Sequence, residues 1–193
     1  MLKYNFILYL VSPFILLKLI FYSLRNSVKF SYLKHKLFVG GPSSSYSVWL
    51  HAASVGEMKI ALRITKSLLD RGFKSILITS NTPSSKLIFE EAKLDTVDHH
   101  YLPFDFFFAT KKFVKSISAE LLIIIETEIW PNLYHHCQVH KTEIITINAR
   151  FNPPKGILGV MSKELYKNTL DKIDHIYCKS KNDVEAFKSY TDE

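Results

Sequence analysis

The stretch Leu121–Asn132, with the sequence LLIIIETEIWPN, decides the predicted fold. Its five apolar residues Leu121–Ile125 run without interruption, which is typical of a short strand buried on both faces of a parallel sheet. Pro131 suits the first turn of a helix, where its missing N–H is not needed. Glu126 and Glu128 therefore lie where a central strand ends and a helix begins. Such a pair indicates either a polar site or a helix cap, and this stretch alone leaves both open.

On both sides of this stretch, apolar runs of strand length alternate with helical segments. The expected strands are Val48–Ala52, Ser75–Thr79, Val97–Leu102, Leu121–Ile125, Glu143–Asn148 and Ile173–Lys179. The expected helices begin near Glu57, Pro83, Phe106, Trp130, Lys163 and Asn182. This alternation predicts an α/β fold with a doubly wound parallel sheet. Ligands of such sheets bind at the carboxyl ends of the strands, so polar residues there are candidate site residues.

Polar residues follow several of the predicted strands. Ser54, Gly56 and Glu57 lie in the turn after the first strand, and a small-residue turn at a helix N-terminus is a ready anion site. Thr82 follows the second strand, and Arg150, a residue suited to carboxylates and phosphates, follows the fifth. Each also has a purely structural interpretation. A first-turn Glu complements the helix dipole, a Thr caps a helix, and an Arg forms a surface ion pair.

The composition allows one domain and argues against nucleic-acid binding. The chain has 193 residues, 47% of them hydrophobic, and a formal net charge of +7. Met1–Gly56 contains no acidic residue, whereas charges in the remainder nearly cancel. A nucleic-acid-binding domain carries its basic residues on the folded body, so no nucleic-acid partner is expected. The cysteines and the adjacent histidine pairs match no metal-ligand spacing, so no metal site is expected.

The segment Phe6–Tyr22 is apolar apart from Ser12, Pro13 and Lys18, which predicts a membrane-associated helix. Its length allows a helix that spans the bilayer or one that lies in the interface, and both remain open. The basic residues that come next are typical of the cytoplasmic side of a membrane. They are Arg25, Lys29, Lys34 and Lys36. Gly40–Ser47 has the composition of a flexible hinge. We therefore divide the chain into a membrane-associated helix with a basic hinge, residues 1–46, and a Rossmann-like domain, residues 47–193.

Five motifs with polar residues are spread over the chain. They are WLHAASVGE at Trp49–Glu57, ILITSNTPS at Ile76–Ser84, YLPFD at Tyr101–Asp105, ETEIWPN at Glu126–Asn132 and INAR at Ile147–Arg150. Together they resemble the N-terminal domain of the 3-deoxy-D-manno-octulosonic acid (Kdo) transferases, the lipid A glycosyltransferases of Gram-negative bacteria. The resemblance covers nearly the whole chain, and the combination of SVGE with ETEIWP is highly specific.

The resemblance implies the Rossmann-like N-terminal half of a GT-B glycosyltransferase, with its active site in the cleft between two halves. It implies transfer of Kdo from CMP-Kdo to a lipid A precursor, with inversion, at the cytoplasmic face of the inner membrane, and with no metal or cofactor. By match to the motifs, Glu57 is the expected general base. The residues expected to bind substrate are Ser54, Gly56, Thr82, Glu126, Glu128 and Arg150.

The sequence departs from the family in two respects. The C-terminal CMP-binding domain is absent from these 193 residues, and the run FNPPKGILG after Arg150 differs from the usual pattern. Three expectations follow. The chain is half of a split enzyme that pairs with a separate C-terminal CMP-binding half, a remnant without activity, or a membrane-attached module that binds lipid A precursor without chemistry.

Overall fold

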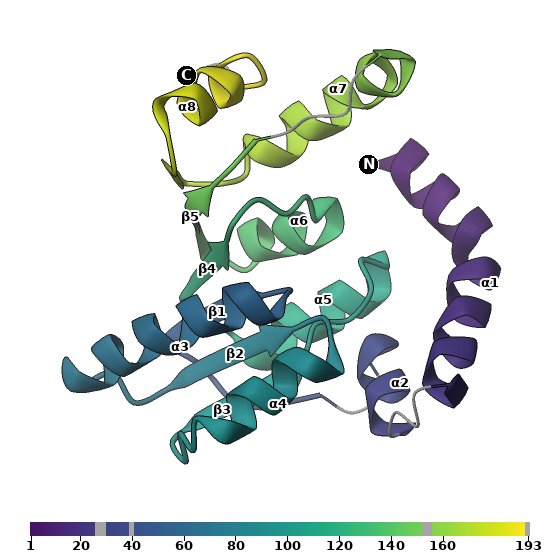
Figure 1. Cartoon of the computed structure of the whole chain (residues 1–193). Coiled ribbons are helices and arrows are strands. Elements are labelled where there is room, and N and C mark those ends of the chain that lie inside the picture. Colours follow the sequence, from purple (N-terminus) through teal and green to yellow (C-terminus); the bar gives the residue numbers. More distant parts are fainter. Residues whose placement is uncertain (26–29, 39–40, 152–155, 192–193) are drawn as a thin grey trace.

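A computed structural model of the chain describes residues 1–25, 30–38, 41–151 and 156–191 (Figure 1). In this part of the chain, six parallel strands form one sheet in the order β3-β2-β1-β4-β5-β6. The strands are β1 Val48–Ala52, β2 Ile76–Ser80, β3 Val97–Tyr101, β4 Leu121–Ile125, β5 Glu143–Ala149 and β6 His175–Cys178. The helices are α1 Leu2–Arg25, α2 Phe30–Lys36, α3 Val55–Asp70, α4 Pro83–Glu91, α5 Phe107–Ile117, α6 Pro131–Val139, α7 Gly156–Leu170 and α8 Lys181–Lys188. The predicted doubly wound parallel sheet is confirmed.

The strand order reverses between β1 and β4, two hydrogen-bonded neighbours in the middle of the sheet. The chain builds β1, β2 and β3 outward on one side, and then returns to place β4, β5 and β6 on the other. In this register His51 of β1 lies opposite Ile124 of β4, so both strands end at the same level. Such a switch point separates the loops of neighbouring strands and leaves a crevice in which ligands of open α/β sheets bind.

Two helix layers cover the sheet, and this explains why β4 is apolar at every position. Leu122 and Ile124 pack with α5 and α6 on one face, while Ile125 packs with α3 on the other. Trp49 and Leu50 of β1 likewise point to opposite layers and are fully buried. Because neighbouring residues of a strand face opposite sides, a strand between two layers is apolar on both faces, and a polar side chain such as His51 is accommodated only where it has hydrogen-bond partners.

The basic segment after the apolar helix differs from its prediction. Part of it, Phe30–Lys36, forms the helix α2, for which no element was predicted, and the Lys36 side chain is buried. The Lys36 ammonium is therefore unavailable to lipid phosphates. Lys29 and Gly40, which belong to the predicted hinge, lie outside the described residues.

The other element boundaries agree with the prediction to within a few residues, apart from one helix. Helix α7 begins at Gly156, seven residues before the expected start at Lys163. Residues 152–155, in the run that departs from the family pattern, lie outside the described residues.

Candidate functional site

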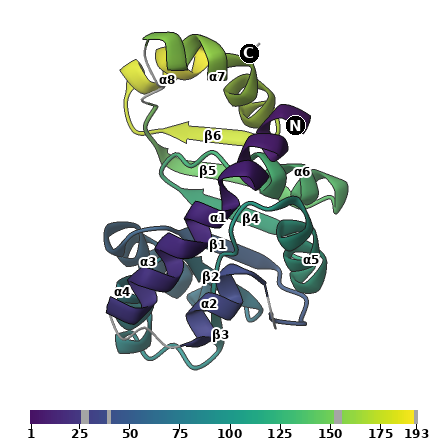
Figure 2. The same ribbon diagram turned by 90° about the vertical axis from the view of Figure 1, so that its right-hand side faces the viewer.

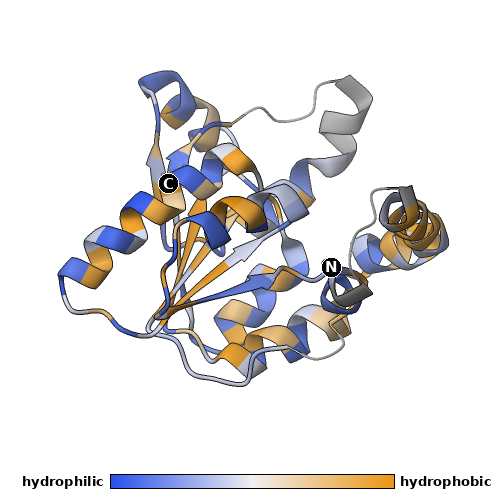
Figure 3. Cartoon of the chain, turned by 60° about the horizontal axis from the view of Figure 1, so that its bottom comes forward, coloured by the Kyte–Doolittle hydropathy of each residue, from blue (hydrophilic) through white to orange (hydrophobic). Residues whose placement is uncertain are grey.

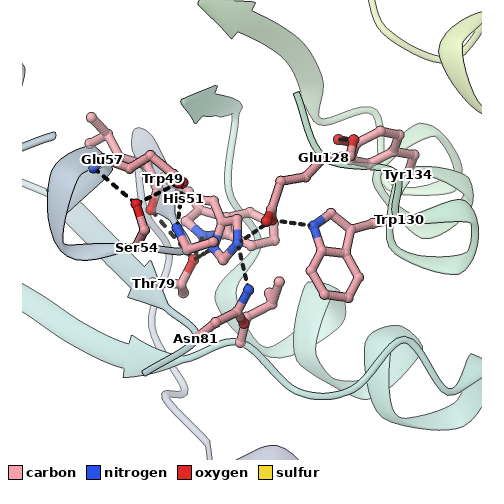
Figure 4. A network of polar contacts seen from close by, with 12 residues as sticks. Trp49, His51, Ser54, Glu57, Thr79, Asn81, Glu128, Trp130 and Tyr134 are labelled. Carbon is pink, nitrogen blue, oxygen red and sulfur yellow. Dashed lines mark hydrogen bonds and ion pairs between the residues drawn. The ribbon is translucent and has the colours of Figure 1, made fainter. Parts of the chain in front are cut away.

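The candidate site lies at the switch point, where the turns after β1 and β4 are adjacent. Ser54–Glu57 follows β1, and Glu126 and Glu128 follow β4. Thr82 lies beyond β2 on one side, and Arg150 lies beyond β5 on the other. The structure thus brings every predicted site residue to the carboxyl edge of one sheet, with the acidic turns on either side of the reversal (Figure 4).

Glu57 closes the N-terminus of its own helix. One carboxylate oxygen, Oε2, accepts a hydrogen bond from the Ala53 backbone N–H at 2.7 Å, and Oε1 accepts one from the Ser54 hydroxyl at 2.6 Å. The Ser54 hydroxyl oxygen in turn accepts from the Glu57 N–H at 3.3 Å. This is a variant of the capping box, in which a Ser and a Glu three residues later satisfy N–H groups reciprocally. Glu57 thus has a structural role at the start of α3 beyond complementing the helix dipole, and its carboxylate is held in one position.

Gly56 is not needed for the shape of this turn. Its φ angle lies outside the left-handed region, and an added Cβ would lie 3.8 Å from the Ser54 hydroxyl oxygen, an ordinary contact distance. An unusual backbone dihedral is therefore not the reason for glycine here. Gly56 is also exposed, which leaves the backbone of the turn open to close approach by a ligand.

Glu128 is oriented by two N–H donors. Its Oε2 accepts a hydrogen bond from the Trp130 indole at 2.6 Å and lies 2.9 Å from Nε2 of His51. The described residues donate no hydrogen bond to the other oxygen, Oε1. The side chain is 22% exposed, so a carboxylate oxygen without a protein partner lies at the edge of the switch point. A carboxylate held in this way accepts a hydrogen bond from a ligand hydroxyl.

The hydrogen bonds behind Glu128 define the protonation of His51. The Trp49 indole donates to the Thr79 hydroxyl oxygen at 2.7 Å, and that hydroxyl lies 2.8 Å from Nδ1 of His51. We place the imidazole proton on Nε2, because the Glu128 carboxylate can only accept a hydrogen bond, and the Thr79 hydroxyl then donates to Nδ1. Nε2–H then donates to Glu128. All three side chains beneath the carboxylate are buried, so the network is rigid.

Electrostatics keep Glu128 ionised. Burial acts to raise the pKa of this carboxyl group, but the hydrogen bonds from His51 and from the Trp130 indole, together with the charge of Lys36, outweigh it, so the pKa is lowered. Lys36 is buried and donates to the Asn81 side-chain oxygen at 2.8 Å and to the Leu102 carbonyl at 2.9 Å. Burial lowers the pKa of Lys36 to about 7, against the attraction of Glu128. The site therefore holds a buried lysine, whose pKa lies near neutral pH, close to an ionised carboxylate.

Comparison with known proteins assigns the chain to a family. The family model described as 3-deoxy-D-manno-octulosonic-acid transferase (kdotransferase) matches residues 25–192. The chain belongs to the Kdo transferase family. It is 35% identical to the 3-deoxy-D-manno-octulosonic acid transferase of Haemophilus influenzae over 54% of the chain, and 32% identical to that of Rickettsia felis over 72%. A bifunctional glycosyltransferase/methyltransferase of Fusobacterium nucleatum is 29% identical over 74% of the chain.

These matches cover only part of each relative. The matched region is 25% of the Haemophilus protein, 30% of the Rickettsia protein and 22% of the Fusobacterium protein. The chain thus spans roughly a quarter to a third of the Kdo transferases it resembles, in the region of the sheet described above.

Two residues at the strand ends of this Kdo transferase domain have left-handed backbone conformations. Glu126 has a φ of 64° and Asn148 has a φ of 54°. The Asn148 amide lies 3.5 Å from Oε1 of Glu126, and the pairing of β5 with β6 shifts register at the same place. Left-handed conformations are common for Asn but unfavourable for Glu, and such strain is concentrated at functional sites.

Thr82 and Arg150 occupy the two ends of the row of site residues. Thr82 caps α4, since its hydroxyl accepts from the Ser85 N–H at 3.2 Å, so its structural interpretation is confirmed. Arg150 is exposed, and within the described ranges no carboxylate lies within 4 Å of its guanidinium group. The Arg150 backbone N–H donates a hydrogen bond to the Thr127 hydroxyl oxygen at 3.1 Å. The charge of the guanidinium nevertheless helps to lower the pKa of the Asp183 carboxyl group, so the charge pairing expected of Arg150 is present at longer range.

The sequence prediction missed the residues that orient Glu128. His51 and Trp130 lie inside the motifs of the Kdo transferase resemblance, but periodicity places His51 in a buried strand with no sign of a partner. Lys36 and Asn81 were assigned no role in the site either. A buried histidine within an apolar strand is a usable signal, because a buried imidazole needs hydrogen-bond partners. Among the residues that the structure describes, no group of three His, Cys, Asp or Glu side chains is placed to hold a metal ion.

Proposed function

We propose that this chain forms the acceptor-binding part of a Kdo transferase. It acts on a lipid A precursor at the cytoplasmic face of the inner membrane, with CMP-Kdo as donor and with a CMP-binding half that completes the cleft. The observation that carries the proposal is the meeting of two acidic turns, Ser54–Glu57 and Glu126–Glu128, at the switch point of the sheet. Sheets of this class bind ligands at that place.

In the proposed reaction Glu57 removes the proton of an acceptor sugar hydroxyl. The hydroxyl oxygen then forms a bond to the anomeric carbon of Kdo, while the bond from that carbon to the phosphate of CMP breaks and CMP leaves. Each carboxylate oxygen has two lone pairs, so the hydrogen bonds from Ala53 and Ser54 leave room for a substrate proton. Those bonds also fix the position of the carboxylate, as a general base requires.

The remaining candidate residues bind and orient the acceptor. Glu128 presents its free oxygen to a second hydroxyl, and Gly56 leaves space for the sugar beside the turn. Arg150 meets an anionic group of the substrate, for which its exposed guanidinium is suited. Ser54 and Thr82 support the turns, and Glu126 shapes the acceptor pocket.

A second candidate function is a module that binds lipid A precursor without chemistry. The observation that favours it is that both oxygens of Glu57 already have partners within the cap. The two functions predict different results for one substitution at this residue.

Glu57→Gln separates the two functions. Gln also completes a capping box, so the fold is retained while the base is lost. With CMP-Kdo, a tetraacyl lipid A acceptor and a candidate CMP-binding half present, we expect transfer to fall about 10²–10⁴-fold with acceptor binding unchanged. Glu91→Gln, an exposed substitution on α4, is the matched control. Undiminished transfer in Glu57→Gln would remove the base assignment, and binding without transfer in the unsubstituted chain would favour the module.

A further inference from the structure

Helix α1 has one apolar exposed face and one face that contacts the domain. It is long and apolar enough to cross a membrane, and in its most apolar 18-residue window only 11% of the residues are buried. Figure 3 shows this helix as predominantly hydrophobic. The outward side chains include Leu2, Phe6, Phe14 and Leu24, which are 71–89% exposed. The less exposed positions are spaced three or four residues apart, so they form one stripe along the helix. They are Tyr4, Asn5, Leu8, Ser12, Ile15, Leu16, Leu19 and Ser23.

The N-terminal end of α1 is hydrogen-bonded to the loops beside the candidate site. The Tyr4 hydroxyl donates to Asp105 at 2.9 Å, and the Asn5 and Asn132 amides bond each other reciprocally at 2.7 and 3.2 Å. Asp105 also accepts from the backbone N–H groups of Asn132 and Leu133, at the N-terminus of α6. Asn132 is fully buried and directly follows the acidic turn of β4. The first turns of α1 are therefore attached to the same edge of the sheet as the site.

The C-terminal part of α1 is also packed on the domain. Leu19 is 7% exposed and forms a cluster with Tyr32 of α2 and Tyr101 of β3. Midway along the helix, the Tyr9 ring stacks on Phe106 with ring centroids 5.6 Å apart. Figure 2 shows α1 running diagonally across the molecule in this arrangement. Contacts at residues 4 and 19 are roughly 22 Å apart along the axis at 1.5 Å per residue, so the helix is held along most of its length.

This attachment is incompatible with a helix that crosses the bilayer. The hydrocarbon core is about 30 Å thick, so a spanning α1 would place residues 4 and 19 at different depths within it. The buried polar groups Asp105 and Asn132 would then either enter hydrocarbon or lose their partners on α1, and both outcomes are unfavourable.

We infer that α1 lies in the plane of an anionic bilayer surface, with its less exposed stripe on the domain and its outer face among the acyl chains. The exposed Lys3 and Lys18 face this surface, and Met1–Gly56 contains no acidic residue that would repel anionic headgroups. The inference deepens the proposed function and rests on it for the identity of the membrane. It places the opening of the acceptor site beside the leaflet that contains the acceptor.

The topology of α1 is tested by a short epitope tag placed before Met1. In inside-out membrane vesicles, proteinase K reaches the cytoplasmic face, whereas in spheroplasts it reaches the opposite face. We expect the tag to be digested in inside-out vesicles and protected in spheroplasts. Digestion in spheroplasts alone would show a spanning helix and overturn the inference.

Flotation of the purified full chain with vesicles tests whether the exposed apolar face of α1 binds a lipid bilayer. With vesicles of phosphatidylglycerol and phosphatidylcholine, we expect binding that weakens when phosphatidylglycerol is omitted, and that falls about tenfold in Phe14→Asp. Val139→Asp, at an exposed apolar residue on α6, is the matched control and should bind normally. If the chain stays unbound and light scattering shows a dimer that Phe14→Asp dissociates, the face joins two copies and the inference is wrong. Neither experiment requires Kdo transfer, so a chain that binds in this way but never transfers Kdo would contradict only the proposed function.

Discussion

At the scale of single residues, Glu57 and Glu128 are both carboxylates held in place by hydrogen bonds, but they differ in which oxygens already accept such bonds. Both oxygens of Glu57 accept hydrogen bonds from its own turn, whereas Glu128 uses one oxygen for His51 and Trp130. The position of Glu57, the proposed base, is therefore set by its own turn. The position of Glu128, the proposed binding group, depends on residues of β1 and β2 as well as on the end of β4. Substitutions at the two residues should therefore affect different steps.

Glu128→Gln tests the binding role. The amide keeps the size of the side chain but loses the charge, and a hydrogen bond to an ionised group contributes about 1.5–3 kcal/mol. We expect acceptor affinity to fall at least about tenfold, with the rate at saturating acceptor little changed. The measurement is a titration of tetraacyl lipid A in detergent micelles. Glu120→Gln, an exposed residue at the opposite edge of the sheet, is the control, and equal affinity of both variants would contradict the role.

Glu126→Gly tests whether the left-handed conformation of Glu126 serves function. Glycine adopts a φ of 64° without steric penalty, so we expect the free energy of unfolding to rise by about 1 kcal/mol. Acceptor binding should nevertheless decrease, because the carboxylate is lost. Urea unfolding and acceptor titration measure the two effects. A variant that is both more stable and fully competent in binding would show that Glu126 has no role in the pocket.

At the scale of elements, α6 joins the candidate site to α1. Its first turn follows Glu128 and Trp130, and its N-terminal N–H groups donate to Asp105, which also accepts from Tyr4. Helix N-termini leave backbone donors unsatisfied, and here a carboxylate from another loop satisfies them. A change on α1 should therefore be detected at the N-terminus of α6.

Asn5→Leu tests this connection. The substitution leaves the buried Asn132 amide without one partner, which costs about 1–3 kcal/mol. We expect faster hydrogen exchange of the Asn132 and Leu133 amides, measured by mass spectrometry of peptides covering α6. Leu10→Ala, on the outer face of α1, should leave their exchange unchanged. Unaltered exchange in Asn5→Leu would show that α6 is positioned without α1.

At the scale of the whole molecule, three histidines that are at least partly buried make stability depend on pH. Burial lowers the pKa of His99 to about 3, and burial together with the charge of a neighbouring histidine lowers the pKa of His35 and of His136 to about 4. Between pH 6.5 and 4 the unfolded chain binds protons that the folded chain does not, so stability is lost as pH falls. Asp105 acts in the opposite direction, since burial raises its pKa to about 7 and its charging destabilises the fold as pH rises.

The effect of the three histidines on stability is expected to exceed the opposite effect of Asp105. We therefore expect the midpoint of thermal unfolding to be lower at pH 5 than at pH 7.5, by on the order of 5 °C. His99→Gln removes one of these groups and retains a polar partner for Ser80, so its midpoint should fall less over the same range. Differential scanning calorimetry at both pH values gives the comparison. A midpoint that rises on acidification would mean that Asp105 dominates.

Much of the fold was predictable because strands and helices are local features. The apolar run of β4, the proline at the start of α6 and the small-residue turn before α3 each specify an element within a few residues. The motifs SVGE and ETEIWP also led to the Kdo transferase family, which the match over residues 25–192 shows. Helix α2 escaped prediction because its seven residues are too short for a periodic signal and its stability comes from packing against β3.

The sequence by itself determined the α/β order of elements, the two acidic turns and the apolar character of α1, because backbone propensity and side-chain periodicity act over a few residues. Only the tertiary structure decided that β1 and β4 are neighbours at a switch point, that His51 and Trp130 hold Glu128, and that Lys36 is buried and hydrogen-bonded to Asn81. Likewise, only the fold placed Tyr4 against Asp105, 101 positions apart in the chain. Strand order and long-range hydrogen bonds depend on how whole layers pack, and no local stretch carries that information.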